Sequence, residues 1–286
     1  MAMRAPLAAR LRALGGAALA ALLLAATLLA VPPATAADTA PAPAAEPAPA
    51  DPAAAPAPDP DAPVFFGTVY VWGSALDGTA STLPPLPAVG VDLSFGDVLE
   101  NLNGALMGAA EMRLGRWSVI GDVMFTQVTP SGTLPGRLGA TVEVRSRSLM
   151  VEGDVLYRLY QSTPVDFDAG AGLRFWNLDN RLTIRGGRRP GGLDYSVSER
   201  WIDPVLAGRV TARLGGPWSA TAVGDIGGFS VGSRLTWQAI GTVNYQWNDN
   251  LALRAGYRAL SVDYQNGDFL YDVVMHGPIV GLTYRF

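Results

Sequence analysis

The sequence predicts an all-β fold, an antiparallel up-and-down transmembrane β-barrel of about ten strands. Apolar and polar residues alternate with a period of two from about residue 65 onward. Of the 286 residues 49% are hydrophobic, yet only Leu14–Val31 forms a continuously apolar run. Each helical crossing of a bilayer needs about 20 consecutive apolar residues, so a multi-helix membrane protein is excluded. The chain also ends in Phe286 on an alternating segment.

Residues 1–36 have the pattern of a secretory signal peptide. Arg4, Arg10 and Arg12 precede the apolar run, and the small-residue pattern 34–36 (Ala-Thr-Ala) follows it. The alternative is a retained inner-membrane anchor, because the run approaches spanning length. The chain has no Cys, which excludes a lipoprotein, a disulfide scaffold and cysteine chemistry.

Residues 37–63 are expected to form a disordered periplasmic spacer. They are almost wholly Ala, Pro, Asp and Glu, and such a segment has no apolar side chains with which to build a core. A role in contacting a periplasmic partner is the alternative. The barrel is expected to occupy 64–286.

The alternation after the spacer fits two environments, a soluble β-sandwich and a membrane barrel. Three features favour the barrel. The apolar faces end repeatedly in Trp or Tyr, as an interfacial girdle requires. Segment lengths match the ~9–11 residues of a tilted membrane strand. Tight turns, such as 115–116 and 248–250, alternate with longer connections, such as 177–199.

Ten strands are expected, with eight or twelve possible if weaker segments are misassigned. The stretch 94–102 is expected to be a short helix that Ser94 or Asp97 caps. An even count puts both ends of the barrel in the periplasm. The expected strands are 65–75, 104–114, 117–129, 141–161, 165–177, 200–215, 217–226, 234–247, 250–264 and 271–286.

The last strand carries the most specific pattern in the chain. Val280, Leu282, Tyr284 and Phe286 share one parity, and a terminal Phe on such a strand resembles the signal that the outer-membrane barrel-assembly machinery recognises. Outer-membrane localisation in a Gram-negative bacterium is therefore expected, with that machinery as a partner.

Several motifs resemble those of a large, mostly uncharacterised proteobacterial family of small outer-membrane barrel proteins of the OmpA type. The resemblance covers about 65–286; it implies the architecture and the location, and says little about activity. The motifs are Gly172-Leu173-Arg174-Phe175-Trp176, Trp201-Ile202-Asp203-Pro204, 224–229 (Gly-Asp-Ile-Gly-Gly-Phe), Gly256-Tyr257-Arg258 and 277–286 (Gly-Pro-Ile-Val-Gly-Leu-Thr-Tyr-Arg-Phe).

The polar parity places a set of charges in the lumen, eight arginines against seven acids. Unpaired charge in a narrow interior is costly, so near balance predicts networks of ion pairs that fill the lumen. The alternative is a narrow ion path lined by the same charges, as in a small passive channel. The residues are Glu111, Arg113, Asp122, Glu152, Asp154, Arg158, Asp168, Arg174, Asp203, Arg209, Arg213, Asp225, Arg254, Arg258 and Arg285.

No catalytic site is expected. His276 is the single His of the chain, its parity matches Phe286, and no Ser lies within two residues of it. It should therefore face lipid or the membrane interface. No Ca²⁺ loop, nucleotide loop or other cofactor motif occurs, and no nucleic-acid partner or metal is expected.

The segment 177–199 is expected to be an extracellular loop that contacts lipopolysaccharide phosphates. It carries Arg181, Arg185, Arg188 and Arg189, and guanidinium groups suit phosphate. A solvated loop countered by Asp179, Asp194 and Glu199 is the alternative. The protein as a whole is expected to be a monomeric, non-enzymatic envelope protein, structural or surface-exposed, in contact with outer-membrane lipids.

Overall fold

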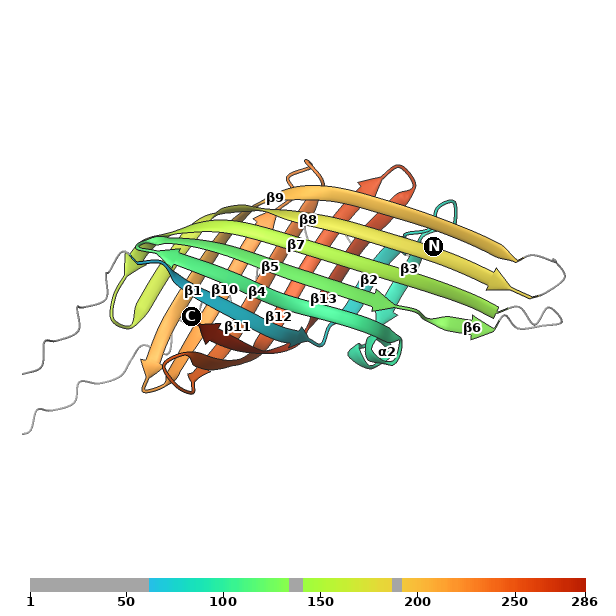
Figure 1. Ribbon diagram of the computed structural model, residues 1–286. Helices are drawn as coiled ribbons and strands as arrows, with labels where there is room; N and C mark the ends of the chain where they lie inside the picture. The colour runs from blue at the N-terminus through green and yellow to red at the C-terminus, as the bar shows by residue number, and fades with distance from the viewer. Residues whose placement is uncertain (1–61, 134–140, 187–191) are drawn as a thin grey trace, which may run out of the picture.

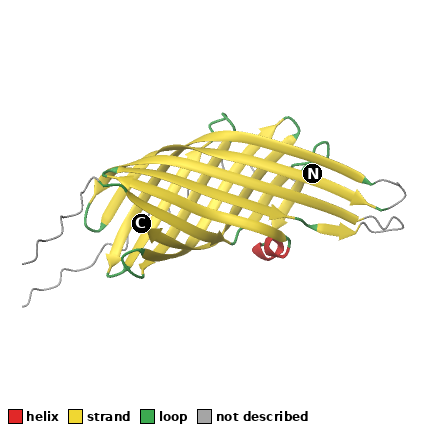
Figure 2. Ribbon diagram, viewed as in Figure 1, coloured by secondary structure: helices red, strands yellow, loops and turns green. Residues whose placement is uncertain are grey.

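The computed structural model describes residues 62–133, 141–186 and 192–286. These residues form one continuous antiparallel sheet that closes on itself, because β1 (Val64–Trp72) pairs with both β4 (Leu102–Leu114) and β13 (Phe269–Arg285). In Figure 1 the strands from β4 to β9 form the near wall, and those from β10 to β13 form the far wall. Figure 2 shows how little of the molecule is not strand.

Neighbours in sequence are neighbours around most of the barrel, which is the up-and-down arrangement that the alternation predicts. The order is β1, β4, β5, β7, β8, β9, β10, β11, β12, β13 and back to β1. The described residues therefore place ten strands around the barrel, as expected. The strands not yet bounded are β5 (Trp117–Val128), β7 (Thr141–Gln161), β8 (Val165–Arg185), β9 (Leu193–Gly215), β10 (Trp218–Gly227), β11 (Leu235–Gln246) and β12 (Leu251–Asn266).

Both ends of the barrel-forming chain lie at the same end of the molecule. The Phe286 N–H donates to the Phe65 carbonyl at 2.9 Å. Two-residue turns close hairpins at this end, and Gly115 and Gly216 in them have φ values of 55° and 53°, which favour glycine. We call it the short-turn end and the opposite one the hairpin end.

The first strand ends earlier than expected, at Trp72, and the stretch between the first two expected strands, 76–103, is not one long loop. After β1 the chain continues as β2 (Ala75–Ser81), which also pairs with β13, and β3 (Val89–Leu93) folds back on β2. The helix expected at 94–102 is confirmed as α2 (Phe95–Glu100). Ser94 is its N-cap in a reciprocal capping box with Asp97.

The loop predicted at 177–199 is also wrong. β8 and β9 continue as a paired hairpin to Ile184↔Leu193, far beyond the last pairing of β9 with β10 at Val205↔Gly227. A short strand, β6 (Ser131–Thr133), extends the opposite side of β7 in the same way. The 177–199 stretch has no regular apolar face, but cross-strand hydrogen bonding continues along it and extends both strands.

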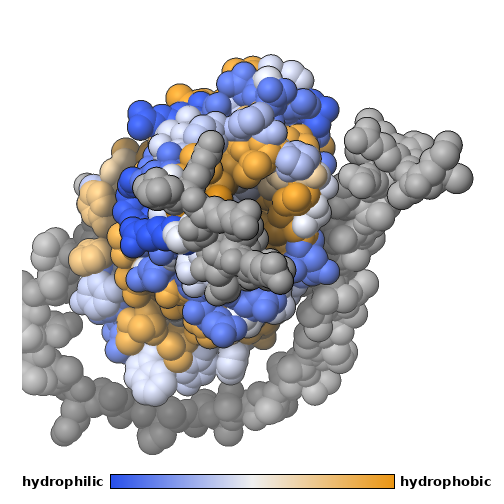
Figure 3. Space-filling view, turned by 90° about the vertical axis from the view of Figure 1, so that its right-hand side faces the viewer, coloured by the Kyte–Doolittle hydropathy of each residue, from blue (hydrophilic) through white to orange (hydrophobic). Residues whose placement is uncertain are grey.

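The two faces of the wall differ as the parity predicts. Outward side chains are apolar and well exposed, such as Val69 at 65% and Leu106 at 67%. Trp117, Trp218 and Tyr284 lie among them near the short-turn end and are about half exposed, which suits an interfacial girdle. Figure 3 shows the molecule from the hairpin end, where hydrophilic and hydrophobic residues are interspersed on the surface.

Candidate functional site

The middle of the lumen is occupied by a network centred on Arg174 of β8. Its guanidinium is fully buried and lies 2.8 Å from Glu152 of β7 and 2.8 Å from Asp225 of β10. Its Nη1 also donates to the Thr236 hydroxyl at 3.0 Å. Such a buried cation is stabilised only because carboxylates and a hydroxyl compensate for its lost water.

A second buried arginine, Arg258 of β12, extends this network across the lumen. It donates to the Tyr70 hydroxyl and to the Gln238 side chain, each at 2.8 Å, and lies 3.2 Å from Asp122. Gln238 in turn donates to Asp225 at 2.9 Å. One connected set of side chains therefore joins β7 on the near wall to β12 on the far wall. We call it the central network.

A second network lies on the short-turn side and is organised by shared carboxylates. Glu111 lies 2.7 Å from both Arg113 and Arg209. Asp168 bridges Arg209 at 2.6 Å and Arg158 at 2.8 Å. Each of these carboxylates thus accepts from two guanidinium groups, an arrangement that charge-assisted hydrogen bonds favour.

The same network continues to the short-turn end through a third shared carboxylate. Asp166 lies 3.8 Å from Arg158 and 2.7 Å from Arg213. We call the set of Glu111, Asp166 and Asp168 with their four arginines the lower network.

On the hairpin side of the central network the lumen is filled by apolar and aromatic side chains. Trp201 stacks on Tyr264 with ring centroids 3.9 Å apart and on Trp176 at 5.8 Å. Such stacked rings bury a large apolar area. We call this cluster the aromatic plug; its buried members are Trp72, Met124, Met150, Trp176, Leu178, Trp201, Leu260, Val262, Tyr264, Phe269, Met275 and Ile279.

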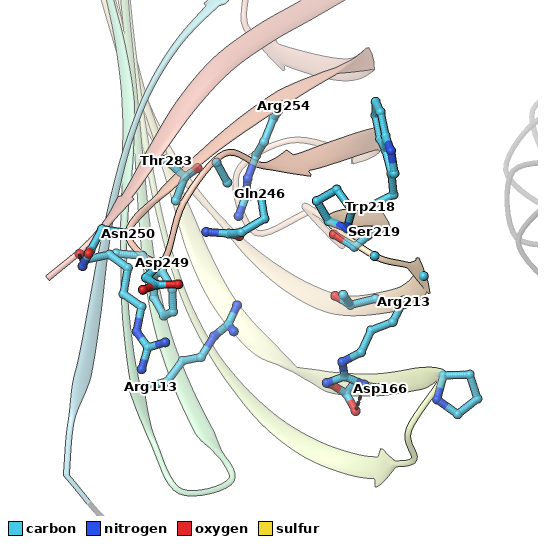
Figure 4. A pocket seen from close by; sticks show the side chains of 18 of the residues that line it. Arg113, Asp166, Arg213, Trp218, Ser219, Gln246, Asp249, Asn250, Arg254 and Thr283 are labelled. Atoms are coloured by element: carbon cyan, nitrogen blue, oxygen red, sulfur yellow. Dashed lines mark hydrogen bonds and ion pairs between the residues drawn. The ribbon is translucent and has the colours of Figure 1, made fainter. Parts of the chain in front are cut away.

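Two cavities lie on the other side of the central network. The larger, about 1000 Å³, opens at the short-turn end; Figure 4 shows Arg254, Arg213 and Arg113 around it. The smaller, about 330 Å³, reaches inward to Glu152 and Arg258. Arg113 and Arg254 line both, so the two cavities are contiguous. We call the larger one the vestibule and the smaller one the inner cavity.

The structure brings most of the expected lumen charges into ion pairs, and four of them make no carboxylate–guanidinium pair with another described residue. Asp203 is satisfied by the Ser233 N–H and hydroxyl, at 2.6 and 2.8 Å, and by the Trp201 indole. Asp154 has a buried Oδ1 without a hydrogen-bond partner among the described residues. Arg254 and Arg285 line the vestibule.

The expectation of a balanced interior concerns the lumen as a whole, and the individual networks are not balanced one by one. The central network holds Arg174 and Arg258 against Asp122, Glu152 and Asp225, with Asp154 beside it. Six arginines lie around the lower network and the vestibule. The whole set balances in number, yet acids are in excess at mid-lumen and arginines toward the short-turn end, because parity assigns a face but not a depth.

Sequence reasoning missed the neutral members of the lumen. Tyr70, Gln238 and Thr236 contact the charged groups, and their inward parity was a signal that could have found them. Asp166 was also missed, although it has the same parity as Asp168. The aromatic plug was not expected, since a Trp or Tyr near a strand end was assigned to the girdle.

His276 lies on the outer face of β13, as its parity predicts. Its Nδ1 lies 2.7 Å from the Tyr257 hydroxyl and its Nε2 lies 2.9 Å from Asp77. These partners come from β12 and β2, on either side of β13. They are far from His276 in sequence, so spacing alone could not have found them.

The C-terminal side chains of one parity also face outward. Val280, Leu282, Tyr284 and Phe286 are exposed, and the rings of Tyr284 and Phe286 meet edge to face with centroids 5.0 Å apart. They form a continuous apolar stripe along the last strand.

Of the four arginines predicted to contact lipopolysaccharide, the structure describes two, Arg181 and Arg185. Arg181 pairs with Asp194 across the β8–β9 hairpin, with its Nε 2.7 Å from the carboxylate. These hydrogen bonds lower the pKa of Asp194. Arg185 ends β8, and Arg188 and Arg189 lie outside the described residues.

The described residues contain no group of three or more His, Asp or Glu side chains arranged to hold a metal ion. Among the same residues, no helix has the length and apolar character needed to cross a bilayer.

The chain resembles several solved structures in its fold. No protein-family model and no curated protein matches the chain. Neisserial surface protein A is 14% identical over 78% of this chain and 97% of that chain, with a TM-score of 0.28. Ail, the attachment invasion locus protein of Yersinia pestis, is 13% identical over 78% and 98%, with a TM-score of 0.36. The translocator domain of the autotransporter NalP from Neisseria meningitidis is 11% identical over 80% and 90%, with a TM-score of 0.33.

Proposed function

We propose that this protein is an outer-membrane β-barrel with a closed lumen and a structural or surface-exposed role in the envelope of a Gram-negative bacterium. The apolar, aromatic-rimmed exterior supports a membrane location, since only a closed barrel satisfies every strand hydrogen bond in lipid. The signal-peptide pattern of 1–36 supports export and cleavage. The role is non-enzymatic and needs no cofactor.

One observation supports the proposal of a closed lumen. The central network and the aromatic plug lie one after the other along the lumen, so both block it. Trp176, Arg174 and Arg258 are each fully buried. Ions crossing the barrel would have to displace stacked rings and separate buried ion pairs, and both steps are costly.

Single-channel recording in planar bilayers tests the proposal. The folded barrel, identified by its altered gel migration when unboiled, should insert without producing steady conductance. Conductance that persists at low voltage would overturn the closed lumen while leaving the membrane barrel intact. A protein that shows no shift on gels and fractionates as soluble would overturn the barrel location itself.

A small passive channel is the second candidate, and the contiguous cavities favour it. The vestibule and the inner cavity, about 1000 and 330 Å³, already extend from the short-turn end to Arg258. Only the aromatic plug and the central network would then have to move. This candidate predicts brief openings that become long when the plug is truncated.

The expected partners follow from the surfaces. The outward stripe Val280, Leu282, Tyr284 and Phe286 supports recognition by the barrel-assembly machinery, and the exterior supports contact with membrane lipid as a monomer. Contact of Arg181, Arg185, Arg188 and Arg189 with lipopolysaccharide phosphates is retained as a proposal. Exchange of all four without any change in lipopolysaccharide co-purification or outer-membrane permeability would defeat it.

A further inference from the structure

The vestibule holds more arginines than the nearby carboxylates can neutralise. Glu111, Asp166 and Asp168 each already bridge two guanidinium groups, and together they engage Arg113, Arg158, Arg209 and Arg213. No carboxylate of the described residues lies within ion-pair distance of Arg254 or Arg285. Asp249 also lines the vestibule and makes no such pair.

Arg254 is the more informative of these two arginines. It projects into the vestibule from β12, as Figure 4 shows, and its neighbours include the cations Arg113 and Arg209 as well as Glu111. Its Nε is buried and has no hydrogen-bond partner among the described residues. Buried guanidinium donors are usually paired, so the Arg254 guanidinium at the wall of an open cavity is available to bind water or an anion.

Arg285 is placed at the mouth of the same cavity. It is exposed on the last residues of β13 and lines the vestibule together with Arg254. An ion that enters from the short-turn end would therefore meet Arg285 first and Arg254 further in. Guanidinium forks suit the oxygens of phosphate and carboxylate groups.

We propose that the vestibule is a binding site for a small oxyanion with two or more negative charges, held by Arg254 and Arg285. With both ends of the barrel in the periplasm, as the even strand count predicts, the site faces the periplasm. The volume of about 1000 Å³ accommodates a small solute with its water. The site does not depend on whether the lumen conducts, because it opens on one side of the central network.

Isothermal titration of the full folded barrel in uncharged micelles tests the site. Inorganic pyrophosphate and citrate serve as separate probes, at matched ionic strength, and distinguish a phosphate-bearing from a carboxylate-bearing ligand. Either probe should bind saturably. Arg254→Gln and Arg285→Gln should each weaken binding about tenfold, which corresponds to roughly 1.4 kcal/mol. Arg254→Lys should retain part of the affinity, because it keeps the charge.

Arg234→Gln is the matched control. This variant loses one positive charge, as the other two do. Arg234, however, pairs with Asp263 toward the hairpin end, away from the vestibule. The affinity of the Arg234→Gln variant for either probe should equal that of the wild type. The proposal is overturned if neither probe binds saturably, if a folded Arg254 or Arg285 variant binds as the wild type does, or if Arg234→Gln weakens binding equally. If Arg254→Gln does not fold, the exposed Arg285→Gln decides by the same criteria.

Discussion

The Arg258 guanidinium donates a hydrogen bond to the Tyr70 hydroxyl at 2.8 Å, although 188 positions separate the two residues. They lie on β12 and β1, the strands on either side of β13. The Tyr70 hydroxyl in turn donates to Asp122 at 2.6 Å. One hydroxyl thus connects a fully buried cation to a carboxylate across the line where the barrel closes.

Tyr70→Phe removes this hydroxyl, so that Arg258 and Asp122 each lose one hydrogen bond in a buried site. We expect the free energy of unfolding to fall by roughly 1–3 kcal/mol, measured by urea titration of the folded barrel. Tyr245→Phe is the control, because Tyr245 faces outward and its hydroxyl makes no hydrogen bond to the described residues. Equal stability of the two variants would contradict an energetic role for the Tyr70 hydroxyl.

Truncation of the aromatic plug should open the lumen. In the Trp176→Ala/Trp201→Ala variant, two stacked rings of the aromatic plug are lost, and we expect conductance in planar bilayers that the wild-type barrel does not show. The control variant Trp117→Ala/Trp218→Ala also removes two tryptophans, but from the outer face, and should leave the conductance unchanged. No difference between these double variants would argue against the plug as the barrier.

Close strand packing makes Gly256 intolerant of a side chain. A Cβ at this position would lie 1.9 Å from the Gly241 carbonyl oxygen. We expect Gly256→Ala to destabilise the barrel by roughly 1–3 kcal/mol or to prevent folding, seen as loss of the unboiled gel shift. Gly241→Ala on the facing strand is the control, since a Cβ there meets nothing within 4 Å. It should fold normally.

The Arg181–Asp194 pair should make the β8–β9 hairpin sensitive to acid. Hydrogen bonds from Arg181 lower the pKa of Asp194, so this contact is complete above the ordinary Asp pKa of about 3.9 and is lost as the pH falls through the lower folded value. Arg181→Gln should return the pKa toward the ordinary value in a carboxyl NMR titration. An unchanged Asp194 titration in that variant, with Arg234→Gln as reference, would refute the coupling.

The terminal ring should matter for assembly more than for stability. Phe286→Ala removes an exposed ring that lies over Gly67, and we expect slower insertion in the presence of the assembly machinery. Phe65→Ala removes another outward ring at the same end and is the control. If both variants insert at the same assisted rate, the terminal Phe is not a recognition signal.

The sequence predicted well the strands that close the barrel, because period-two alternation follows directly from the two faces of a sheet. It predicted α2 because Ser94 and Asp97 cap a helix through local hydrogen bonds. It failed at β2, β3 and the ends of β8 and β9. There both faces are polar or mixed, and cross-strand hydrogen bonding alone extends the strands.

In the lumen, the difference between what the sequence predicts and what the tertiary structure decides is larger. By itself the sequence determined which side chains point inward, the turns between the strands and the outward stripe that ends in Phe286. Only the closed barrel decided that Arg174 meets Asp225, that Arg258 meets Tyr70, and that Arg254 meets no carboxylate. Parity defines a face, whereas depth and cross-lumen neighbours depend on the register and closure of all the strands.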